Sequence, residues 1–252
     1  MIPRSKVREN LQVWICRDLS DPEEYWIKGI VKTILSPSPG TEYGENGTVV
    51  RLFDGQIGTV VKIIDHEDIT ESEILHLLSG GETQNVEFKE TFSVANDTHE
   101  QIGCLRDQTV KEISAMMNGE GGILFIGVND AGQVTGLDPD YKYVIPRRTT
   151  QTIQDKFKQE IHSYVKDKLI DATLEEKYKI TISNVQNHEI AVIQIDSSEK
   201  PVFVEEKIKF IECVTEREKK GTRQLFYIRT DSGTLKLDSR QIFDYWKQKL
   251  QH

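Results

Sequence analysis

The chain has 252 residues, which is enough for one large domain or two smaller ones with hydrophobic cores of their own. Its 37% hydrophobic and 29% charged residues are typical of a globular protein, and it lacks the run of about 18 apolar residues that a membrane-spanning helix needs. A net charge of −9 argues against non-specific nucleic-acid binding by the chain as a whole.

The charge is unevenly distributed along the sequence. Residues 66–140 contain 15 acidic and 3 basic side chains, whereas residues 141–252 contain 17 acidic and 21 basic ones. The middle of the chain therefore has an excess of carboxylates that cations would neutralise, and the last third can supply a basic surface. The alternative for any single charge is a solvated position on the surface.

Cysteine usage and the N-terminus indicate the compartment. Cys16, Cys104 and Cys213 are far apart and form no CxxC pair, which argues against a zinc site or a disulfide framework. The first ten residues, MIPRSKVREN, lack the apolar core of a secretory signal. We therefore expect a reducing, cytoplasmic setting and no membrane association.

Four predicted strands occupy the first quarter of the chain. LQVWICR and YWIKGIVKTIL are rich in β-branched and aromatic residues, and GTVVRLFDGQIGTVVKII contains two strands around Asp54-Gly55, a pair typical of a type I′ hairpin turn. We expect residues 1–66 to form a small SH3- or OB-like β-barrel. A helical connector is predicted over 67–81, where Thr70 and Glu73 have capping-box spacing.

The remaining residues, 82–252, alternate between helix and strand patterns. Helices are predicted over about 98–118 and 149–168 and after Asp238. Strands are predicted at VEFK, GILFIGV, KYKITISNV, HEIAVIQID, KPVFV and QLFYIRTDSGTLKL. GILFIGV is apolar throughout, as expected for a strand buried on both faces. The predicted fold class is α+β, a small barrel followed by a mixed α/β domain.

Several blocks of the second region resemble the Schlafen AlbA_2 family. They are VEFKETF, AMMNGEGGILFIGVNDAGQVTGL, KPVFV and FYIRTDSGTLKLDSRQIFDYW, in the family's order. RTDSGT departs slightly from the family's usual pattern, which has a glycine before the serine. Separately, GIVKTILSPSP and VRLFDGQIGTV resemble the small YwbE-like domain, which implies a compact barrel with no assigned chemistry.

The Schlafen resemblance implies a ribonuclease site with three acidic residues. Glu82 and Glu87 have the family's E-x-x-x-x-E-F-K spacing, and GVND supplies Asp130. The resemblance thus implies that these three carboxylates bind Mg²⁺ or Mn²⁺. Lys89, two residues after Glu87 on the same strand face, is expected to contact the scissile phosphate.

Strand geometry adds a condition to this reading. Residues five apart on a strand point to opposite faces, so Glu82 meets Glu87 only if the chain bends, and Gly80-Gly81 would permit such a bend. Oxygen ligands suit a hard divalent cation, which can activate water and stabilise a phosphodiester. The structural alternative is that Glu82 lies in a loop, Glu87 pairs with Lys89, and Asp130 begins a turn.

Basic residues of the last third are candidates for contacts with a nucleic-acid backbone. Arg229 belongs to the Y-x-R block and is the strongest of them, and a solvated hairpin tip is the alternative for those near EREKKGTR. The candidates are Lys142, Arg147, Arg148, Lys219, Lys220, Arg223, Arg229 and Lys236.

The sequence thus predicts a divalent-metal-dependent endoribonuclease acting on structured RNA, with tRNA as the leading substrate by resemblance. A homodimer is expected, because mammalian relatives place two such domains across a basic valley and this chain has one. The alternatives are a non-catalytic nucleic-acid-binding or regulatory module and a protein-interaction scaffold built on the barrel.

Overall fold

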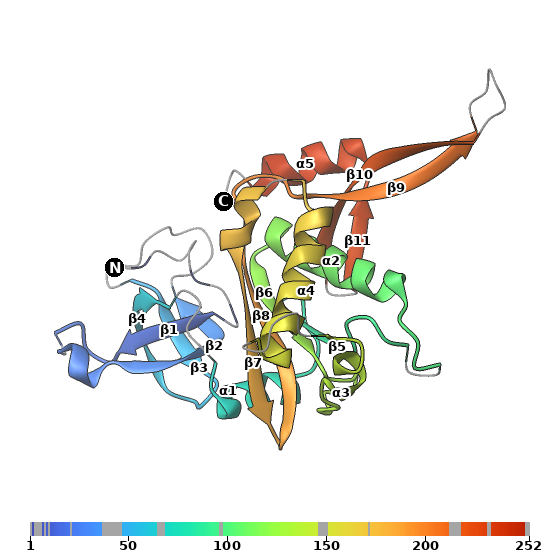
Figure 1. Cartoon of the computed structure of the whole chain (residues 1–252). Helices are drawn as coiled ribbons and strands as arrows, with labels where there is room; N and C mark the ends of the chain where they lie inside the picture. Colours follow the sequence, from blue (N-terminus) through green and yellow to red (C-terminus); the bar gives the residue numbers. More distant parts are fainter. Residues whose placement is uncertain are drawn as a thin grey trace.

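The structure is a computed structural model of the whole chain (Figure 1). It describes residues 2, 7, 9, 11–20, 22–36, 47–64, 69–95, 98–145, 151–170, 172–211, 218–230 and 233–249. No helix in these ranges is long and apolar enough to cross a membrane.

The N-terminal region is a closed four-stranded antiparallel barrel, as predicted. Alternating apolar residues point inward, and Val13, Ile15, Val31, Leu52 and Val60 are fully buried. The barrel is compatible with the YwbE-like resemblance. Its strands are β1 (Gln12–Cys16), β2 (Ile27–Ser36), β3 (Val49–Leu52) and β4 (Ile57–Ile63), and a single 3-10 turn, η2 (Glu23–Tyr25), lies between β1 and β2.

The hairpin between β3 and β4 is confirmed, but its predicted turn type is wrong. Gly55 has φ +89°, whereas Asp54 does not have positive φ, so the type I′ turn is excluded. Gly55 N–H donates to Leu52 O, and the Asp54 carboxylate accepts from Gln56 N–H. The three-residue loop is stabilised by the aspartate side chain instead.

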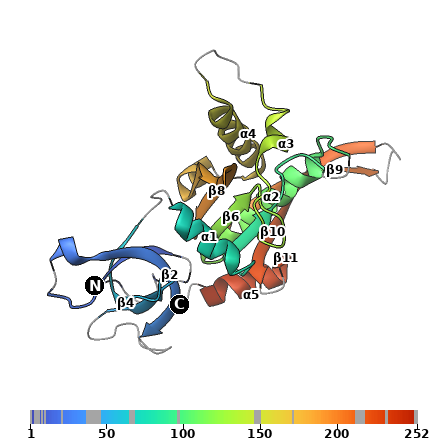
Figure 2. The ribbon, with the colours of Figure 1, turned by 90° about the horizontal axis from the view of Figure 1, so that it is seen from below.

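Helix α1 (Glu71–Ser79) joins the barrel to the rest of the molecule. The predicted capping box between Thr70 and Glu73 is present. Ile74, Leu77 and Leu78 share one hydrophobic cluster with Ile30 of the barrel and with residues of the central sheet. Figure 2 shows α1 between the barrel and the sheet. The proposed boundaries at 66 and 81 stay a prediction.

The central sheet has the strand order β5-β6-β8-β7, with β5 parallel to β6 and the other pairs antiparallel. Every residue of β6 is buried, which confirms the prediction from its apolar run. Gln186 and Asn187 both have positive φ, so the β7–β8 turn has the backbone signature of type I′. The strands are β5 (Val86–Lys89), β6 (Gly121–Ile126), β7 (Tyr178–Val185) and β8 (His188–Asp196).

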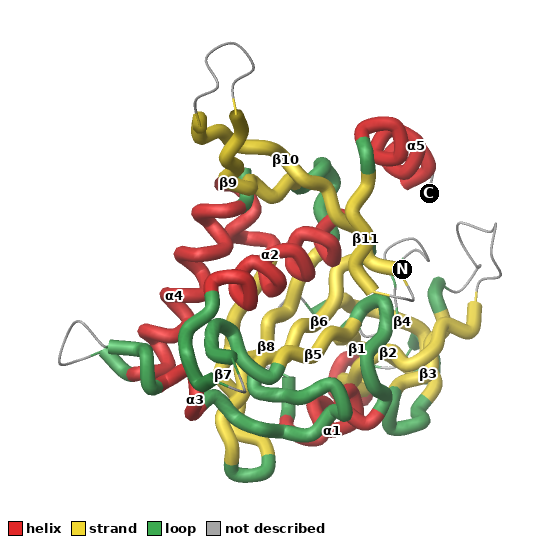
Figure 3. Tube along the Cα trace, turned by 90° about the vertical axis from the view of Figure 1, so that its right-hand side faces the viewer, coloured by secondary structure: helices red, strands yellow, loops and turns green. Residues whose placement is uncertain are grey.

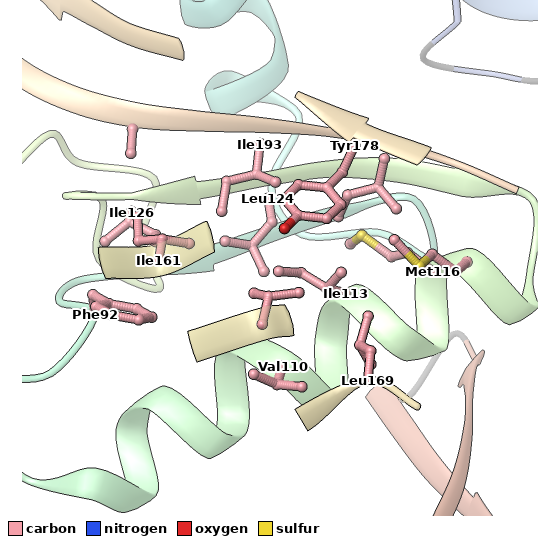
Figure 4. Packing of buried hydrophobic residues seen from close by; sticks show 14 of the residues in the cluster. Phe92, Val110, Ile113, Met116, Leu124, Ile126, Ile161, Leu169, Tyr178 and Ile193 are labelled. Carbon is pink, nitrogen blue, oxygen red and sulfur yellow. The ribbon is translucent and has the colours of Figure 1, made fainter. Parts of the chain in front are cut away.

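The two faces of this sheet have different coverings. Leu124 and Ile126 of β6 face α2 (Gly103–Asn118) and α4 (Ile153–Lys168), and this layer forms the largest core (Figure 4). Ile123 and Phe125 face α1 and the barrel. Figure 3 shows α2 and α4 together on one side of the sheet. Two short elements, α3 (Asp138–Tyr141) and η3 (Ala172–Lys177), flank α4 along the chain.

Helix α2 begins five residues later than predicted. Residues before it form a tight loop in which Ala95 N–H donates to Glu100 O, and His99 adopts positive φ. Local hydrogen bonds of this kind compete with helix formation. The predicted start at 98 is therefore wrong, whereas the end at Asn118 is correct.

A second antiparallel sheet has the order β11-β10-β9, and its β9–β10 hairpin extends away from the body (Figure 1). Helix α5 packs Tyr245 and Trp246 on one face against Phe226. The predicted Asp238–Gln241 cap is present. The elements are β9 (Phe203–Ile211), β10 (Glu218–Thr230), β11 (Gly233–Leu237) and α5 (Ser239–Lys249).

The fully buried Asn118 connects α2 to this second sheet. Its amide nitrogen donates to Val202 O and Tyr227 O, both at 2.9 Å, and its amide oxygen accepts from Val202 N–H at 2.8 Å. Lys249 of α5 donates to the carbonyls of Asn118 and Gly119. The predicted α+β class is confirmed, and these bonds position the two sheets around the end of α2.

Candidate active site

Glu82 is folded back against the strand that contains Glu87. Thr83 and Val86 form a bridge in which each backbone N–H donates to the other's carbonyl, so the chain reverses between them. The Glu82 carboxylate then accepts from Phe88 N–H at 2.9 Å. Glu82 thus returns to β5, as a convergence with Glu87 requires, but the reversal lies at 83–86, and Gly81 with φ +73° only leads into it.

This hydrogen bond has a simple structural cause. Strand β5 is an edge strand of the central sheet, so some of its backbone groups lack a neighbouring strand. One carboxylate oxygen of Glu82 satisfies the Phe88 donor. The second oxygen has no bond to the backbone of β5 and remains available to a ligand.

Glu87 and Lys89 lie on the same face of β5, as predicted, and form an ion pair. Glu87 is only 7% exposed because α2 and β10 cover that face. Its second oxygen lies 2.9 Å from the Arg229 guanidinium. Lys89 also donates to Phe88 O. The structural alternative for Glu87, a pairing with Lys89, is therefore present in the structure.

Arg229 is the centre of a buried charge network. It is 6% exposed, and NH1 lies 2.9 Å from Glu87 and 2.6 Å from Glu112 of α2. Its remaining donors reach the carbonyls of Thr83 and Gln84. One arginine thus clamps the reversal that places Glu82, and at the same time compensates two carboxylates.

Asp130 lies in an exposed turn four residues after β6. Gly127 N–H and Val128 N–H both donate to Lys89 O, which connects the end of β6 to the end of β5. Asn129, not Asp130, stabilises the turn, because its side chain accepts from Ala131 N–H and Gln133 N–H. Asp130 thus lies in the turn, as in the structural alternative, but the Asn129 side chain is the one that stabilises it.

The pKa of Glu82 is raised above its ordinary value. Desolvation of the carboxylate raises this pKa most, and the Phe88 hydrogen bond lowers it. The negative charges of Glu87 and Asp130 raise it further, while Lys89 lowers it. Residues 48 positions apart in sequence, Glu82 and Asp130, therefore act on one another electrostatically.

The carboxylates of this site are suitable ligands for a divalent cation, but their positions do not form a complete metal site. Carboxylate oxygens are the ligands that Mg²⁺ and Mn²⁺ prefer, and a bound cation would offset the repulsion that Glu87 and Asp130 exert on Glu82. Within the described residues, however, no three His, Cys, Asp or Glu side chains are arranged closely enough to hold a metal ion. Both oxygens of Glu87 face cations in this arrangement, which compete with a metal for that ligand.

The basic candidates fall into three groups. Lys142, Lys220 and Lys236 are exposed, and Arg223 is exposed and paired with Glu206. Lys219 lies on β10, but its side chain, like Arg147 and Arg148, is outside the described residues. The prediction that Arg229 contacts a nucleic-acid backbone is wrong. Its guanidinium is buried and donates to carboxylates and carbonyls of the protein.

Two residues of the site were missed in the sequence. Glu112 lies in the middle of α2, and Thr234 on β11 donates to it while also contacting Arg229. Glu112 belongs to no recognisable motif, whereas Thr234 ends the RTDSGT stretch of the Schlafen-like block but was given no role there. Their roles depend on the packing of α2 against β10, which local patterns do not show.

Comparison with known proteins identifies one family. The model of the family described as "Schlafen, AlbA_2" matches residues 82–238, more than half of the chain. No curated protein sequence matches this chain.

The DIP2311 protein from Corynebacterium diphtheriae is a solved structure to which part of this chain is similar. The similarity has a TM-score of 0.39 and 16% identity, and it covers 65% of this chain and 24% of that one. This chain therefore corresponds to about a quarter of that protein. The family assignment comes from the sequence match alone: the chain belongs to the Schlafen AlbA_2 family.

Proposed function

We propose that this protein is a divalent-metal-dependent endoribonuclease that hydrolyses phosphodiesters of structured RNA, with tRNA as the leading substrate. The observation that carries the proposal is the reversal at 83–86, which brings Glu82 back to Glu87 within the electrostatic field of Asp130. A cation bound by these carboxylates would relieve their mutual repulsion.

Each residue of the site has a role in this proposal. Glu82, Glu87 and Asp130 would hold Mg²⁺ or Mn²⁺, which when bound supplies an activated water and charge stabilisation at the phosphodiester. Arg229 fixes the Thr83–Gln84 backbone and so positions Glu82. Lys89, which is partly exposed beside Glu87, would face the negative charge of the substrate.

The proposed substrate surface continues from this site along β10. Arg223 lies six residues before Arg229, so it points to the same face of the strand about 20 Å away. Lys142, Lys220 and Lys236 add exposed positive charge elsewhere on the domain. A homodimer would double this surface, and a cytoplasmic location would match the scattered cysteines. Both belong to the proposal.

The second candidate is a non-catalytic nucleic-acid-binding module. The ion pairs of Glu87 with Lys89 and Arg229 favour it, because they neutralise the central carboxylate without any metal. In that case the acidic residues are structural and the basic side chains alone contact nucleic acid. The two functions differ in their need for divalent ions.

Cleavage of total tRNA separates the two functions. The purified protein is incubated with Mn²⁺ or Mg²⁺, with EDTA, and as the Asp130→Asn variant, chosen because Asp130 is exposed and does not stabilise its own turn. Asp244→Asn, an exposed acid on α5, is the matched control. The nuclease predicts discrete fragments that require metal, disappear in Asp130→Asn and persist in Asp244→Asn.

The other results have equally clear meanings. Intact tRNA with a gel shift that EDTA does not change would replace the nuclease with the binding module. Intact tRNA without a shift would contradict both functions and direct attention to protein partners of the barrel.

A further inference from the structure

A second polar site lies near the N-terminal end of α2, where Arg106 contributes to it. Between α2 and α4 there is an open cleft of about 510 Å³, in the size range of small-ligand sites. It does not include Glu82, Glu87 or Asp130, and nothing in the proposed nuclease uses it. Side chains that can donate hydrogen bonds dominate its wall: Gln101, Arg106, Tyr143, Lys156, Gln159 and Ser163.

Arg106 is held in this cleft without a partner for one of its donors. Its guanidinium lies 5.5 Å from the ring centre of Phe92 and 5.7 Å from that of Tyr164. Its Nε is buried, and among the described residues no acceptor is within hydrogen-bonding distance of it. A buried donor left unpaired is costly, and because this Nε is itself shielded from solvent, an acceptor from outside the chain would reach the guanidinium through its other nitrogens on the cleft wall.

Lys156 provides a second cation in the same wall. It is 8% exposed, and its ammonium group is 3.5 Å from Glu160, which is a long contact for a group with three donors. The cleft thus combines a planar guanidinium fixed by two aromatic rings and an ammonium with spare donors. This pair suits the oxygens of a phosphate group.

The rest of the wall limits the class of ligand. Tyr143 donates its hydroxyl to His99 O, which fixes a ring that is still 39% exposed and can stack on a base. The acids in the wall, Glu160 and Asp167, disfavour a polyanion lying along the cleft and can accept from ribose hydroxyls. A single nucleotide unit meets these conditions better than a continuous backbone.

The structural alternative is that Arg106 only balances Asp140. Asp140 is buried and accepts from Phe92 N–H, Ser93 N–H and Ser93 Oγ–H, so its hydrogen bonds come from other groups. Desolvation raises the pKa of Asp140, and Arg106 lowers it least among the contributing groups. Charge balance therefore does not account for the unpaired Nε.

We propose that the cleft between α2 and α4 binds the phosphate monoester of a nucleotide, with Arg106 and Lys156 on the phosphate and Tyr143 against the base. The monoester belongs either to a free nucleotide or to the 5′ end of an RNA. This site is independent of the acidic site, and its binding needs no divalent metal.

Equilibrium binding in EDTA tests the proposal on the full chain. The probes are 5′-AMP with adenosine as its control, and a short 5′-phosphorylated RNA with its 5′-hydroxyl form. We expect the phosphorylated probes to bind and the controls to bind at least about tenfold more weakly, because the charged hydrogen bonds are lost. Binding by AMP alone identifies a free nucleotide, and binding by the phosphorylated RNA alone identifies an RNA end.

Variants assign the binding to the cleft. Arg106→Lys keeps the charge but loses the planar fork, and Lys156→Gln removes the second cation without touching Arg106. Each should weaken phosphate-dependent binding at least about tenfold while circular dichroism stays unchanged. Lys158→Gln is the control, since Lys158 lies on the same helix but pairs with Asp155 outside the cleft.

If Arg106→Lys does not fold, Lys156→Gln alone decides the assignment. The proposal is overturned if no phosphorylated probe binds, if the phosphorylated and unphosphorylated probes bind equally, or if folded cleft variants bind as well as Lys158→Gln.

Discussion

Arg106 belongs to α2, and Arg229 of β10 contacts the same helix through Glu112. The two arginines have opposite environments. Arg229 uses its donors on Glu87, Glu112 and two backbone carbonyls, whereas Arg106 has a buried Nε with no acceptor among the described residues. Both are held rigidly, one by ion pairs and the other by aromatic rings. A fully paired buried arginine maintains the architecture, and a rigid unpaired one is suited to a ligand.

The largest expected effect comes from breaking the Arg229 network. Arg229→Met leaves Glu112 buried without a cation and releases the Thr83–Gln84 carbonyls, so we expect the free energy of unfolding to fall by about 3–5 kcal/mol. Urea denaturation measures this loss. Arg223→Met, which removes an exposed ion pair with Glu206, should cost less than about 1 kcal/mol. Equal costs for the two variants would contradict the clamp.

Asn118, at the C-terminal end of α2, is an uncharged buried side chain whose amide is hydrogen-bonded, as the Arg229 guanidinium is. Asn118→Ala leaves Tyr227 O and Val202 N–H without their Asn118 partner in the interior and leaves Val202 O with only its longer bond from Ser114, so it should lower the free energy of unfolding by about 3 kcal/mol. Ser114→Ala removes one longer bond to Val202 O and should cost about 1 kcal/mol. If chemical denaturation shows no difference between them, Asn118 does not connect the two sheets.

Lys249 is an intermediate case, because carbonyl and hydroxyl oxygens accept from it but no carboxylate of the described residues contacts it. Burial lowers its pKa from 10.5 to about 8, and Glu120 opposes the change. Between these two values the unfolded chain binds more protons than the folded one, so this group makes stability rise with pH. We expect wild type to gain stability relative to Lys249→Met between pH 7.5 and pH 10. A constant or reversed difference would contradict this.

The smallest effect on stability is expected at Arg106. Arg106→Met loses contacts with two rings but also removes a buried unpaired donor, so the free energy of unfolding should change by no more than about 1 kcal/mol. Thermal or urea denaturation beside Arg229→Met tests this. A loss as large as that of Arg229→Met would make Arg106 architectural and remove the basis for a nucleotide cleft.

Local patterns were sufficient for most of the fold. The apolar run of β6, the capping residues Thr70 and Asp238, and the barrel strands are short-range signals, and the structure has all of them. The two hairpin turns show where such signals fail. Gln186-Asn187 adopts positive φ at both positions, whereas Asp54-Gly55, the stronger sequence signal, does so only at Gly55.

The site was predictable only in part, because its geometry depends on distant contacts. The Schlafen resemblance implied the pair Glu82 and Glu87, but the Thr83–Val86 bridge that brings Glu82 back to β5 is held by Arg229, which lies 146 residues after Thr83. The prediction that Arg229 contacts nucleic acid is wrong, because the burial of this β10 residue against β5, α2 and β11 has no signature in the sequence around it.

The proposed endoribonuclease requires that Glu82, Glu87 and Asp130 together bind a divalent cation. Calorimetric titration of the RNA-free protein with Mn²⁺, beside the Glu82→Gln variant, tests it most directly, because a glutamine oxygen can still accept from Phe88 N–H and preserve the fold. We expect saturable Mn²⁺ binding by the wild type and no such binding by the folded Glu82→Gln variant. No binding by wild type, or equal binding by both proteins, would contradict it.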